Sequence, residues 1–222
     1  MTATKPTAEP FLPAQRSLRS LQTAAEKCEG CSLFENATQT VFGHGKVKAP
    51  IMLIGEQPGD QEDRAGLPFV GPAGRLLAKA LDDADIDPES TYQTNAVKHF
   101  KFTRKGGKRR IHQKPNRTEV VACRPWLLAE IDVIHPQVIV CLGATAAQSL
   151  LGASFRVSAH RGEVLTLAAA APATTADEGP AVVATVHPSA VLRDRSDRRD
   201  DAYQAFVDDL RSARSAQLRS AS

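Results

Sequence analysis

The sequence predicts an α/β protein, a three-layer α/β/α sandwich whose central sheet is mostly parallel. Three short apolar runs, at 51–54, 138–142 and 181–186, have the length and composition of buried strands. Segments with helical spacing separate these runs, as expected for a sheet that helices cover on both faces. Each run ends in a glycine or a polar residue, and open sheets of this kind bind ligands at the carboxyl ends of their strands. The residues that follow the three runs are therefore the first candidates for a functional site.

The other elements follow from apolar spacing and from turn residues. Helices are predicted over 17–27, 76–84, 118–131, 144–151 and 203–210, and further strands over 91–97 and 162–167. The stretch 101–117 is predicted to be a long loop, because Gly106-Gly107 and Pro115 forbid a continuous helix. The low-complexity stretch 168–180 is also predicted to be a loop.

Length and composition indicate one ordinary globular domain. We expect a single domain over 17–212, between a flexible tail at 1–16 and a frayed end at 213–222. The chain has 222 residues, of which 42% are hydrophobic and 24% charged, as in soluble proteins with a sizeable core. No apolar run approaches the ~20 residues that cross a membrane, and the N-terminus lacks the apolar part of a secretory signal. We therefore expect a monomeric cytoplasmic protein with no membrane partner.

Positive charge is concentrated in one stretch of the chain. The net charge is +3, yet eight Lys and Arg side chains lie between Lys101 and Arg117, and no acidic residue lies between Ser90 and Thr118. Without those eight, 20 basic residues remain against 25 acidic ones. A local cluster of this kind favours an anionic partner at one place on the surface.

The stretch that follows the first apolar run is rich in polar groups. The chain breaks at Gly55 into a segment that holds Glu56, Gln57 and Asp60, and a helix is predicted to resume after Pro72. Carboxylates and an amide just past a buried strand are typical of a ligand site, and glycine there lets the backbone approach the ligand. The alternative is an ordinary solvated loop, and this stretch alone does not decide between the two.

Four cysteines are spaced as a metal centre could use them. Cys28 and Cys31 form a CxxC pair, which is too close for most structural disulfides but suits two thiolates on one metal. Cys123 and Cys141 could complete a four-thiolate site, although their spacing is not that of a zinc ribbon. Zinc and an iron–sulfur cluster both accept four thiolates, so residue types leave the metal open. The remaining alternative is a CxxC turn with two unrelated buried thiols.

Several separated blocks of sequence together resemble a known family. The chain resembles the iron–sulfur uracil-DNA glycosylases of family 4, and more closely their UdgX branch, which attaches itself covalently to DNA. The resemblance runs from about Leu18 to Leu210 and includes both later cysteines. Ordinary family 4 enzymes have Ala or Gly where Gln57 stands, and they lack the KRRIH stretch. The blocks are CEGC at 28–31, GEQPGDQEDRAGLPFVGPAGRLL at 55–77, TNAVKHFKF at 94–102, KRRIHQKP at 108–115 and HPSAVLR at 187–193.

The resemblance implies a fold, a cofactor and a substrate. It implies an α/β/α sandwich that acts on uracil-containing DNA, single- or double-stranded, and that excises uracil. It also implies a [4Fe–4S] cluster, which we expect to be architectural. By the same match the cluster ligands would be Cys28, Cys31, Cys123 and Cys141.

The resemblance also implies roles for individual residues. Phe69 would stack on uracil, Asn95 would read its Watson–Crick edge, and His187 would contact O2. His112 would join C1′ of the sugar. The remaining pocket residues would be Gly55, Glu56, Gln57 and Asp60, of which Glu56 and Gln57 are also catalytic candidates.

The chemistry of uracil excision suits these residue types. The base must leave the stack, which costs a few kcal/mol, and a Phe face such as Phe69 returns about 1–3 kcal/mol. Cleavage leaves negative charge on uracil, which a donor on His187 would stabilise, and positive charge on the sugar, which Glu56 would stabilise. Asn95 offers both a donor and an acceptor, as the edge of uracil requires. Without the resemblance, Phe69 could equally be a core aromatic, and His187 and Asn95 could simply end strands.

His112 is the least ordinary assignment. An imidazole attacks only when it is neutral, and neighbouring Lys108, Arg109 and Arg110 are expected to lower its pKa. An alkylated imidazole is a poor leaving group, so an adduct at C1′ would persist. The alternative is that this stretch binds phosphates and that its histidine is incidental.

Phosphate contacts are expected from the same basic stretch. The DNA-binding candidates are Lys108, Arg109, Arg110, Ser189 and Arg193. Three functions remain distinct: a glycosylase that ends covalently bound to DNA, an ordinary glycosylase that turns over, and a zinc-stabilised DNA-binding module without chemistry.

Overall fold

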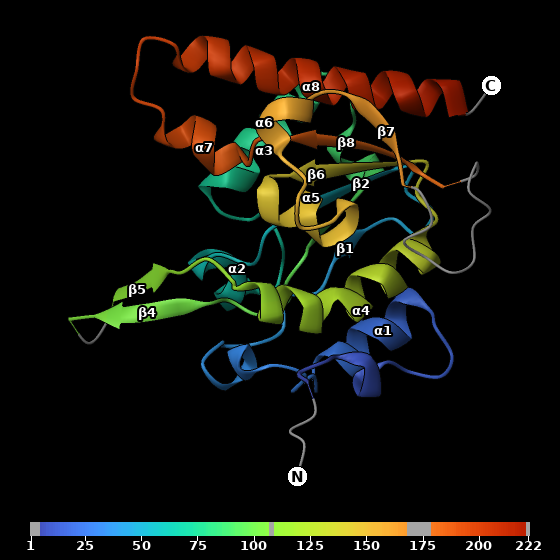
Figure 1. Cartoon of the computed structure of the whole chain (residues 1–222), viewed down its shortest axis with the longest axis vertical. Coiled ribbons are helices and arrows are strands. Elements are labelled where there is room, and N and C mark those ends of the chain that lie inside the picture. Colours follow the sequence, from blue (N-terminus) through green and yellow to red (C-terminus); the bar gives the residue numbers. More distant parts are fainter. Residues whose placement is uncertain (1–4, 107–108, 168–178, 221–222) are drawn as a thin grey trace.

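A six-stranded sheet forms the centre of the molecule (Figure 1). The computed structural model describes residues 5–106, 109–167 and 179–220. In the sheet, strand order is β1-β3-β2-β6-β8-β7, with parallel pairing from β3 to β8 and antiparallel pairing at both edges. The predicted α/β fold with a mostly parallel sheet is confirmed. The strands are β1 (His44–Gly45), β2 (Ile51–Gly55), β3 (Thr91–Asn95), β6 (Val138–Leu142), β7 (Val164–Thr166) and β8 (Ala181–Thr185).

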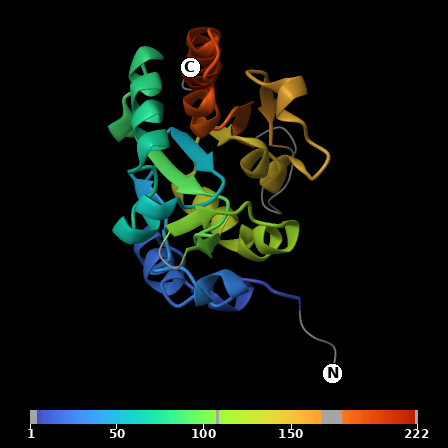
Figure 2. The ribbon, with the colours of Figure 1, turned by 90° about the vertical axis from the view of Figure 1, so that its left-hand side faces the viewer.

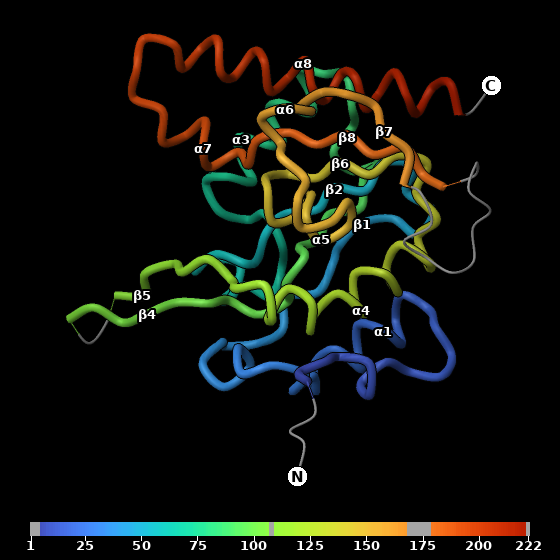
Figure 3. Tube along the Cα trace, viewed as in Figure 1, coloured from blue at the N-terminus to red at the C-terminus, as the bar shows by residue number. Residues whose placement is uncertain are grey.

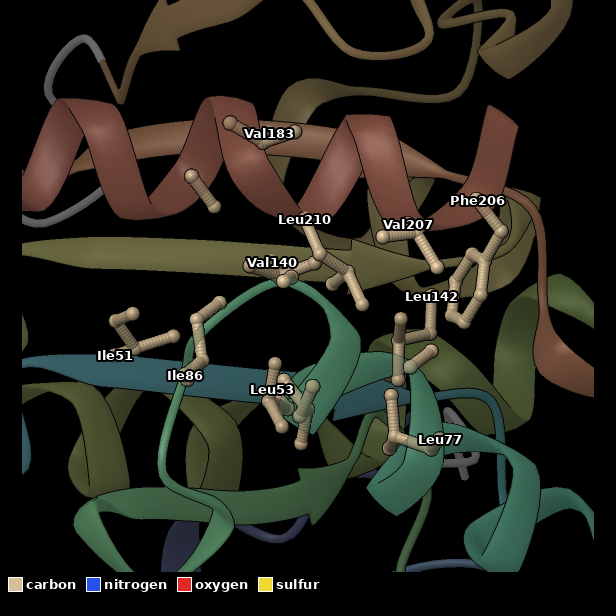
Figure 4. Close-up of a cluster of buried hydrophobic side chains, with 14 of the residues drawn as sticks. Ile51, Leu53, Leu77, Ile86, Val140, Leu142, Val183, Phe206, Val207 and Leu210 are labelled. Carbon is tan, nitrogen blue, oxygen red and sulfur yellow. The ribbon is translucent and has the colours of Figure 1, made fainter. Parts of the chain in front are cut away.

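Alternation of side chains along the strands builds a core on each face. Ile51 and Leu53 of β2 face α3 (Pro72–Asp83) and α8 (Arg199–Ser220), and Figure 4 shows them packed with Leu77 and Leu210. Met52 and Ile54 point to the other face, toward α4 (Arg117–Ile134) and α5 (Ala144–Leu151). The period of two along a strand produces this division and makes β2 apolar throughout.

The remaining elements are short or lie outside the sandwich. Helix α1 (Leu18–Ala25) packs on the side of α4 that faces away from the sheet, and Figure 2 shows this N-terminal region, in blue, at the end of the molecule opposite α8. The short helices are α2 (Asp60–Ala65), α6 (Val157–His160) and α7 (Pro188–Arg193). Single 3₁₀ turns are η1 (Glu9–Phe11), η2 (Ser32–Glu35) and η3 (Pro88–Ser90).

Both ends of the chain are more ordered than composition indicates. Ala8 is buried, and its N–H donates to the carbonyl of Ala122 in α4 at 2.8 Å, so part of the stretch expected to be a flexible tail packs on the domain. At the other end α8 continues to Ser220, and Ala213 and Ala216 are buried in the core. The expected frayed end over 213–222 is therefore wrong up to Ser220, because alanines spaced along a helix bury well despite a polar composition.

The basic stretch 101–117 is a β-hairpin rather than a long loop. Strands β4 (Phe102–Lys105) and β5 (Arg109–His112) pair antiparallel, with Phe102 opposite His112, and they project from the body of the molecule (Figure 3). Gly106, at φ 60°, enters the turn in a left-handed conformation that glycine adopts without strain. The prediction excluded a helix correctly but overlooked that Gly106 could serve a hairpin turn.

The described residues contain no helix that is both long and apolar enough to span a bilayer. Most of the loop predicted over 168–180 lies outside the described residues.

Candidate active site

The parallel strands converge on one cavity. Strands β2, β3, β6 and β8 all end at the same edge of the sheet, and a cavity of about 830 Å³ lies there. The chain segments after three of these strands supply Glu56, Gly143 and His187 to its wall, which is the position expected for an open α/β sheet. The predicted residues that line it are Glu56, Gln57, Asp60, Phe69, Asn95, His112, His187, Ser189 and Arg193.

Gly55, Asn95 and Phe69 form one tightly packed wall. Gly55 and Asn95 are partners in neighbouring strands, and Asn95 is buried. A Cβ atom on Gly55 would lie 2.3 Å from Oδ1 of Asn95 and 2.8 Å from Cζ of Phe69, so only glycine fits. Phe69 has φ 57°, a strained conformation for a bulky residue. Strain of this kind persists where neighbouring packing enforces it.

His187 has a defined neutral tautomer. The backbone N–H of Ser189 donates to its Nδ1 at 3.2 Å, so Nδ1 is an acceptor and Nε2 carries the proton. The hydroxyl of Ser189 lies 2.8 Å from the same nitrogen and accepts from Nη1 of Arg193 at 3.0 Å. Burial lowers the pKa of His187 to about 4, with smaller effects from Arg193 and His112. The ring therefore presents an N–H donor, without charge, at neutral pH.

Gln57 determines the tautomer of His112. Its Oε1 accepts from the N–H of Lys101 at 3.0 Å, and its Nε2 donates to the carbonyl of Gln113 at 2.9 Å. The amide nitrogen of Gln57 lies 2.9 Å from Nε2 of His112. Because that nitrogen is a donor, Nε2 of His112 is the acceptor and keeps its lone pair.

The pKa of His112 is lowered, as predicted, but for another reason. Burial is the largest cause, Glu56 opposes it, and Arg193 adds to the lowering. Arg109 and Arg110 are not among the causes, and Lys108 lies outside the described residues. The predicted direction of the pKa shift is confirmed, but the cation that contributes is Arg193, from a distant part of the chain, and not Arg109 or Arg110.

Glu56 lies between His112 and a threonine that the sequence analysis missed. The hydroxyl of Thr145 donates to Oε2 of Glu56, and Oε1 lies 3.7 Å from Nε2 of His112. Thr145 lies in the first turn of α5, and this helix follows β6 after the single residue Gly143. The same strand-end rule that identified Glu56 could have found it.

Arg110 and Asp60 are partners of each other. Arg110 forms ion pairs with Asp60 and with the buried Asp63, and its side chain is only 7% exposed. The other oxygen of Asp60 accepts from Arg64 at 3.0 Å. Burial alone would raise the pKa of Asp60, but the hydrogen bonds from Arg110 and Arg64 outweigh it and lower the pKa. Arg110 is therefore a structural cation that joins the hairpin to α2, and little of its side chain is available for the DNA contact predicted for it.

The other expected DNA contacts differ in their accessibility. Arg109 and Arg193 are exposed, whereas Ser189 is half-buried beside His187. Lys108 lies outside the described residues. Lys114 was not singled out in the sequence, yet it lines the cavity.

Three of the four cysteines gather where the segment after α1, which carries Cys28 and Cys31, packs on α4, which carries Cys123. Cys28, Cys31 and Cys123 pack in one cluster, where burial raises the pKa of Cys123 to about 12 and the other two thiols add to the effect. Cys28 and Cys123 accept from Nε1 of Trp126 at 3.2 Å and from the N–H of Lys98 at 3.3 Å. Cys141 lies instead within β6, in the core between the sheet and α5, where only burial raises its pKa. The structure does not bring Cys141 to the other three.

A buried histidine lies beside this group of thiols. His99 directly follows Lys98, and its Nε2 is 2.9 Å from Oγ1 of Thr40. That hydroxyl donates to the carbonyl of Ala25, which also accepts from the N–H of Cys28. His99 was not predicted as a site residue, although it belongs to the TNAVKHFKF block at 94–102.

The three thiols and the neighbouring His99 are the possible donors for a metal centre in this region. Among the described His, Cys, Asp and Glu side chains, no three converge closely enough to hold one metal ion. Thiolates on a single zinc must all lie about 2.3 Å from it, whereas those of a cubane each bind a separate iron and stand farther apart. Three thiols with a neighbouring imidazole are a donor set that structural zinc and an iron–sulfur cluster both accept.

Comparisons with known proteins agree with this geometry. The family model "Uracil DNA glycosylase superfamily" matches residues 42–211. The chain is 36% identical over 191 residues to a Type-4 uracil-DNA glycosylase from Thermotoga maritima, covering 86% of this chain and 89% of that one. It is 35% identical over 176 residues to a Type-4 uracil-DNA glycosylase from Pyrobaculum aerophilum, covering 79% and 85%. A strand-end cavity lined by histidines, a carboxylate and an amide, and this extent of similarity, lead to one conclusion: the chain belongs to the uracil DNA glycosylase superfamily.

Proposed function

We propose that this protein cleaves the N-glycosidic bond of deoxyuridine in DNA and that His112 then captures C1′ of the sugar in a covalent adduct. The observation that carries the proposal is the lone pair on Nε2 of His112, held 2.9 Å from Gln57 and 3.7 Å from Glu56 in the cavity that also contains His187. The names of the relatives from Thermotoga maritima and Pyrobaculum aerophilum support uracil in DNA as the substrate.

Base recognition is assigned to the wall formed by Gly55, Asn95 and Phe69. The extruded base lies against the Phe69 ring, which offsets part of the cost of unstacking. The amide of Asn95 bonds the Watson–Crick edge with one donor and one acceptor, which selects uracil over cytosine. Gly55 leaves room because any side chain there would enter the same space.

Bond cleavage separates charge, and two groups respond to it. The electron pair of the C1′–N1 bond leaves with uracil, and the Nε2–H of His187 donates to O2 as negative charge develops there. The carboxylate of Glu56, fixed by Thr145, stabilises the cationic sugar. Because the pKa of His187 is lowered to about 4, it acts as a neutral donor and does not need to lose or gain a proton.

The capture step uses the lone pair of His112. As uracil leaves, the Nε2 lone pair forms a bond to C1′, and the hydrogen bond from Gln57 is released. The product is an N-alkylated imidazolium, whose positive charge is that of the sugar cation it quenches. Water attack at the same carbon, oriented by Glu56, is the alternative that gives an ordinary enzyme with turnover.

The test is incubation with a uracil-containing oligonucleotide, read by a denaturing gel and by assay of free uracil. The wild type is expected to release one uracil per protein molecule and to form an adduct that resists denaturation. His112→Ala is expected to form no adduct. His160→Ala is the matched control, because His160 is also about half exposed but lies outside the cavity. Multiple turnovers by the wild type would support the ordinary glycosylase. Adduct formation by His112→Ala would refute the role of this residue. If the wild type released no uracil at all, the protein would be a DNA-binding module without catalytic activity.

We also propose that Cys28, Cys31 and Cys123 hold a [4Fe–4S] cluster and that His99, rather than Cys141, supplies the fourth ligand. His99 is only 5% exposed and is connected to the thiol group from two sides, through Thr40 and through the neighbouring Lys98 N–H. The cluster when bound supplies cross-links between the N-terminal segment and α4. No step of the reaction uses it.

A further inference from the structure

We propose that a groove along the first turns of α4 binds the sugar–phosphate backbone of the DNA strand as it leaves the active-site cavity. The proposal rests on the proposed function, because it takes DNA as the substrate, and adds a second contact region outside the reaction site. The groove has a volume of about 490 Å³ and lies between α4 and the α5 region. Its wall includes Lys114, Arg117, Val121, Arg124 and Thr145.

The groove continues directly from the active-site cavity. Lys114 and Thr145 line both spaces, and Thr145 is the residue that bonds Glu56. A strand whose uridine is inserted in the cavity must continue away from it in two directions. The groove beyond Lys114 provides a path for the strand in one of these two directions.

The charge of the groove is of one sign. Three cations line it, and none of its lining residues is acidic. Within the described part of the chain, Lys114 and Arg117 have no ion-pair partner, whereas Lys101 and Arg110 of the same basic stretch are bound to Glu119 and to two aspartates. An anion can therefore reach unpaired positive charge at the C-terminal end of this stretch, on Lys114 and Arg117, as well as on the exposed hairpin.

The shape of the groove also suits a nucleic-acid strand. Arg124 donates from Nε to the carbonyl of Ser149 at 2.9 Å, which holds its guanidinium along the wall. Val121 is 53% exposed beside it, and the half-buried Val120 lines the same groove. Cations that alternate with apolar surface match phosphates that alternate with sugars. Continuity with the cavity selects DNA over an acidic peptide as the occupant.

The experiment measures binding to uracil-containing single strands of two lengths, by fluorescence anisotropy over a range of salt concentrations. Every variant carries His112→Ala so that covalent capture does not interfere. Arg117→Gln is compared with Arg19→Gln. Both arginines are exposed and lack ion-pair partners among the described residues, and each substitution removes one positive charge. Arg117→Gln is expected to weaken binding of the long strand several-fold and to reduce its log–log salt slope by roughly 0.7, the contribution of one phosphate on a single strand. A trinucleotide with central deoxyuridine, too short to reach the groove, is expected to bind both variants equally.

Each other outcome overturns the groove assignment. If the salt slope of Arg117→Gln equals that of Arg19→Gln, no phosphate contacts Arg117. If the trinucleotide is affected as strongly as the long strand, the substitution acts through the reaction cavity or the fold. If an acidic peptide of equal charge competes as well as DNA, the groove is a protein-binding surface. The readout is binding alone, so absence of excision or adduct in the wild type would refute the proposed function without changing these measurements.

Discussion

The Nε2 atoms of Gln57 and His112 lie 2.9 Å apart, and the amide of Gln57 is oriented so that the histidine nitrogen must be the acceptor. Lys101 and Gln113, at the two ends of the hairpin, fix that orientation through their backbone groups. One buried amide therefore joins the hairpin that carries His112 to the strand end that carries Glu56. It holds the imidazole in the tautomer that leaves a lone pair on Nε2.

Replacement of Gln57 by alanine is expected to slow adduct formation by about 10²-fold while uracil release falls less. The reason is that loss of the amide frees the hairpin and the His112 ring, and small displacements of a reacting group can cost that much. The measurement is single-turnover kinetics that follow free uracil and adduct separately. Gln61→Ala is the matched control, because Gln61 lines the same cavity but is exposed. Equal slowing of release and capture in Gln57→Ala would contradict a specific role in orienting His112.

The pH dependence of capture follows from the lowered pKa of His112. Attack needs the unprotonated ring, so the rate of adduct formation is expected to be level at neutral pH and to fall only below the ordinary imidazole pKa of about 6.5. Arg193 lowers the pKa of His112, so Arg193→Gln should shift this acid limb to higher pH. The profile is measured at saturating DNA, with Arg195→Gln as the control for loss of an exposed charge. An acid limb that moves down in Arg193→Gln, or does not move, would contradict this electrostatic account.

How much of this site the sequence predicts depends on the kind of signal. Asn95 ends a strand, and Glu56 and His187 come shortly after strands, so their meeting at one edge of the sheet was predictable from the strand ends. Contacts between charged side chains were not. Nothing in the spacing of Arg110 shows that Asp60 and Asp63 would bind it, because that pairing depends on how the hairpin packs on α2.

Cys141 shows the same limit for metal ligands. The sequence places it on a strand, but thiol count and spacing do not reveal that this strand is central and that the side chain is enclosed by its own core. The sequence gives no such signal for His99, because a lone histidine has no spacing that relates it to the cysteines. The hairpin was missed because its strands are short and mostly polar, so apolar alternation, the usual sign of a strand, is weak there.

Iron content should distinguish the cysteines. Cys141→Ala is expected to keep the iron and acid-labile sulfide of the wild type, whereas Cys123→Ala should lose most of both. His99→Cys should retain the cluster, because a thiolate replaces the imidazole as ligand, and His99→Ala should not. The readouts are iron and sulfide per chain and the absorption spectrum of freshly purified protein. A folded Cys141→Ala that has lost its iron would show that the strand cysteine is a ligand after all.

The ion pair of Lys98 and Glu130 lies beneath Asn95 and is almost completely buried, at 1% and 0% side-chain exposure. Nζ of Lys98 also donates to the carbonyl of Asn95 at 2.7 Å, and the hydroxyls of Tyr92 and Thr94 donate to the carboxylate. Lys98→Met leaves that carboxylate without its cation and is expected to reduce the free energy of unfolding by about 3–5 kcal/mol.

Denaturant unfolding measures this loss, and the exposed pair of Lys79 and Asp83 supplies the control. Lys79→Met should change stability little, because solvent screens exposed pairs. Addition of Glu130→Gln to Lys98→Met should recover part of the stability, since the unpaired charge is then removed. If Lys98→Met is no more destabilising than Lys79→Met, the buried pair does not support the strand end that carries Asn95.

Gly55→Ala tests the base pocket itself. The added Cβ would lie 2.3 Å from Oδ1 of Asn95 and 2.8 Å from Cζ of Phe69, so one or both must move. Because these two side chains are the proposed contacts of uracil, release of uracil is expected to fall by about 10²-fold. Affinity for DNA without uracil should stay unchanged, since the residues proposed to contact phosphates lie elsewhere. Ala73→Ser, which also adds one atom to a residue lining the cavity, is expected to release uracil at nearly the wild-type rate. Wild-type rates in Gly55→Ala, with the fold intact by circular dichroism, would mean that uracil does not bind against Asn95 and Phe69.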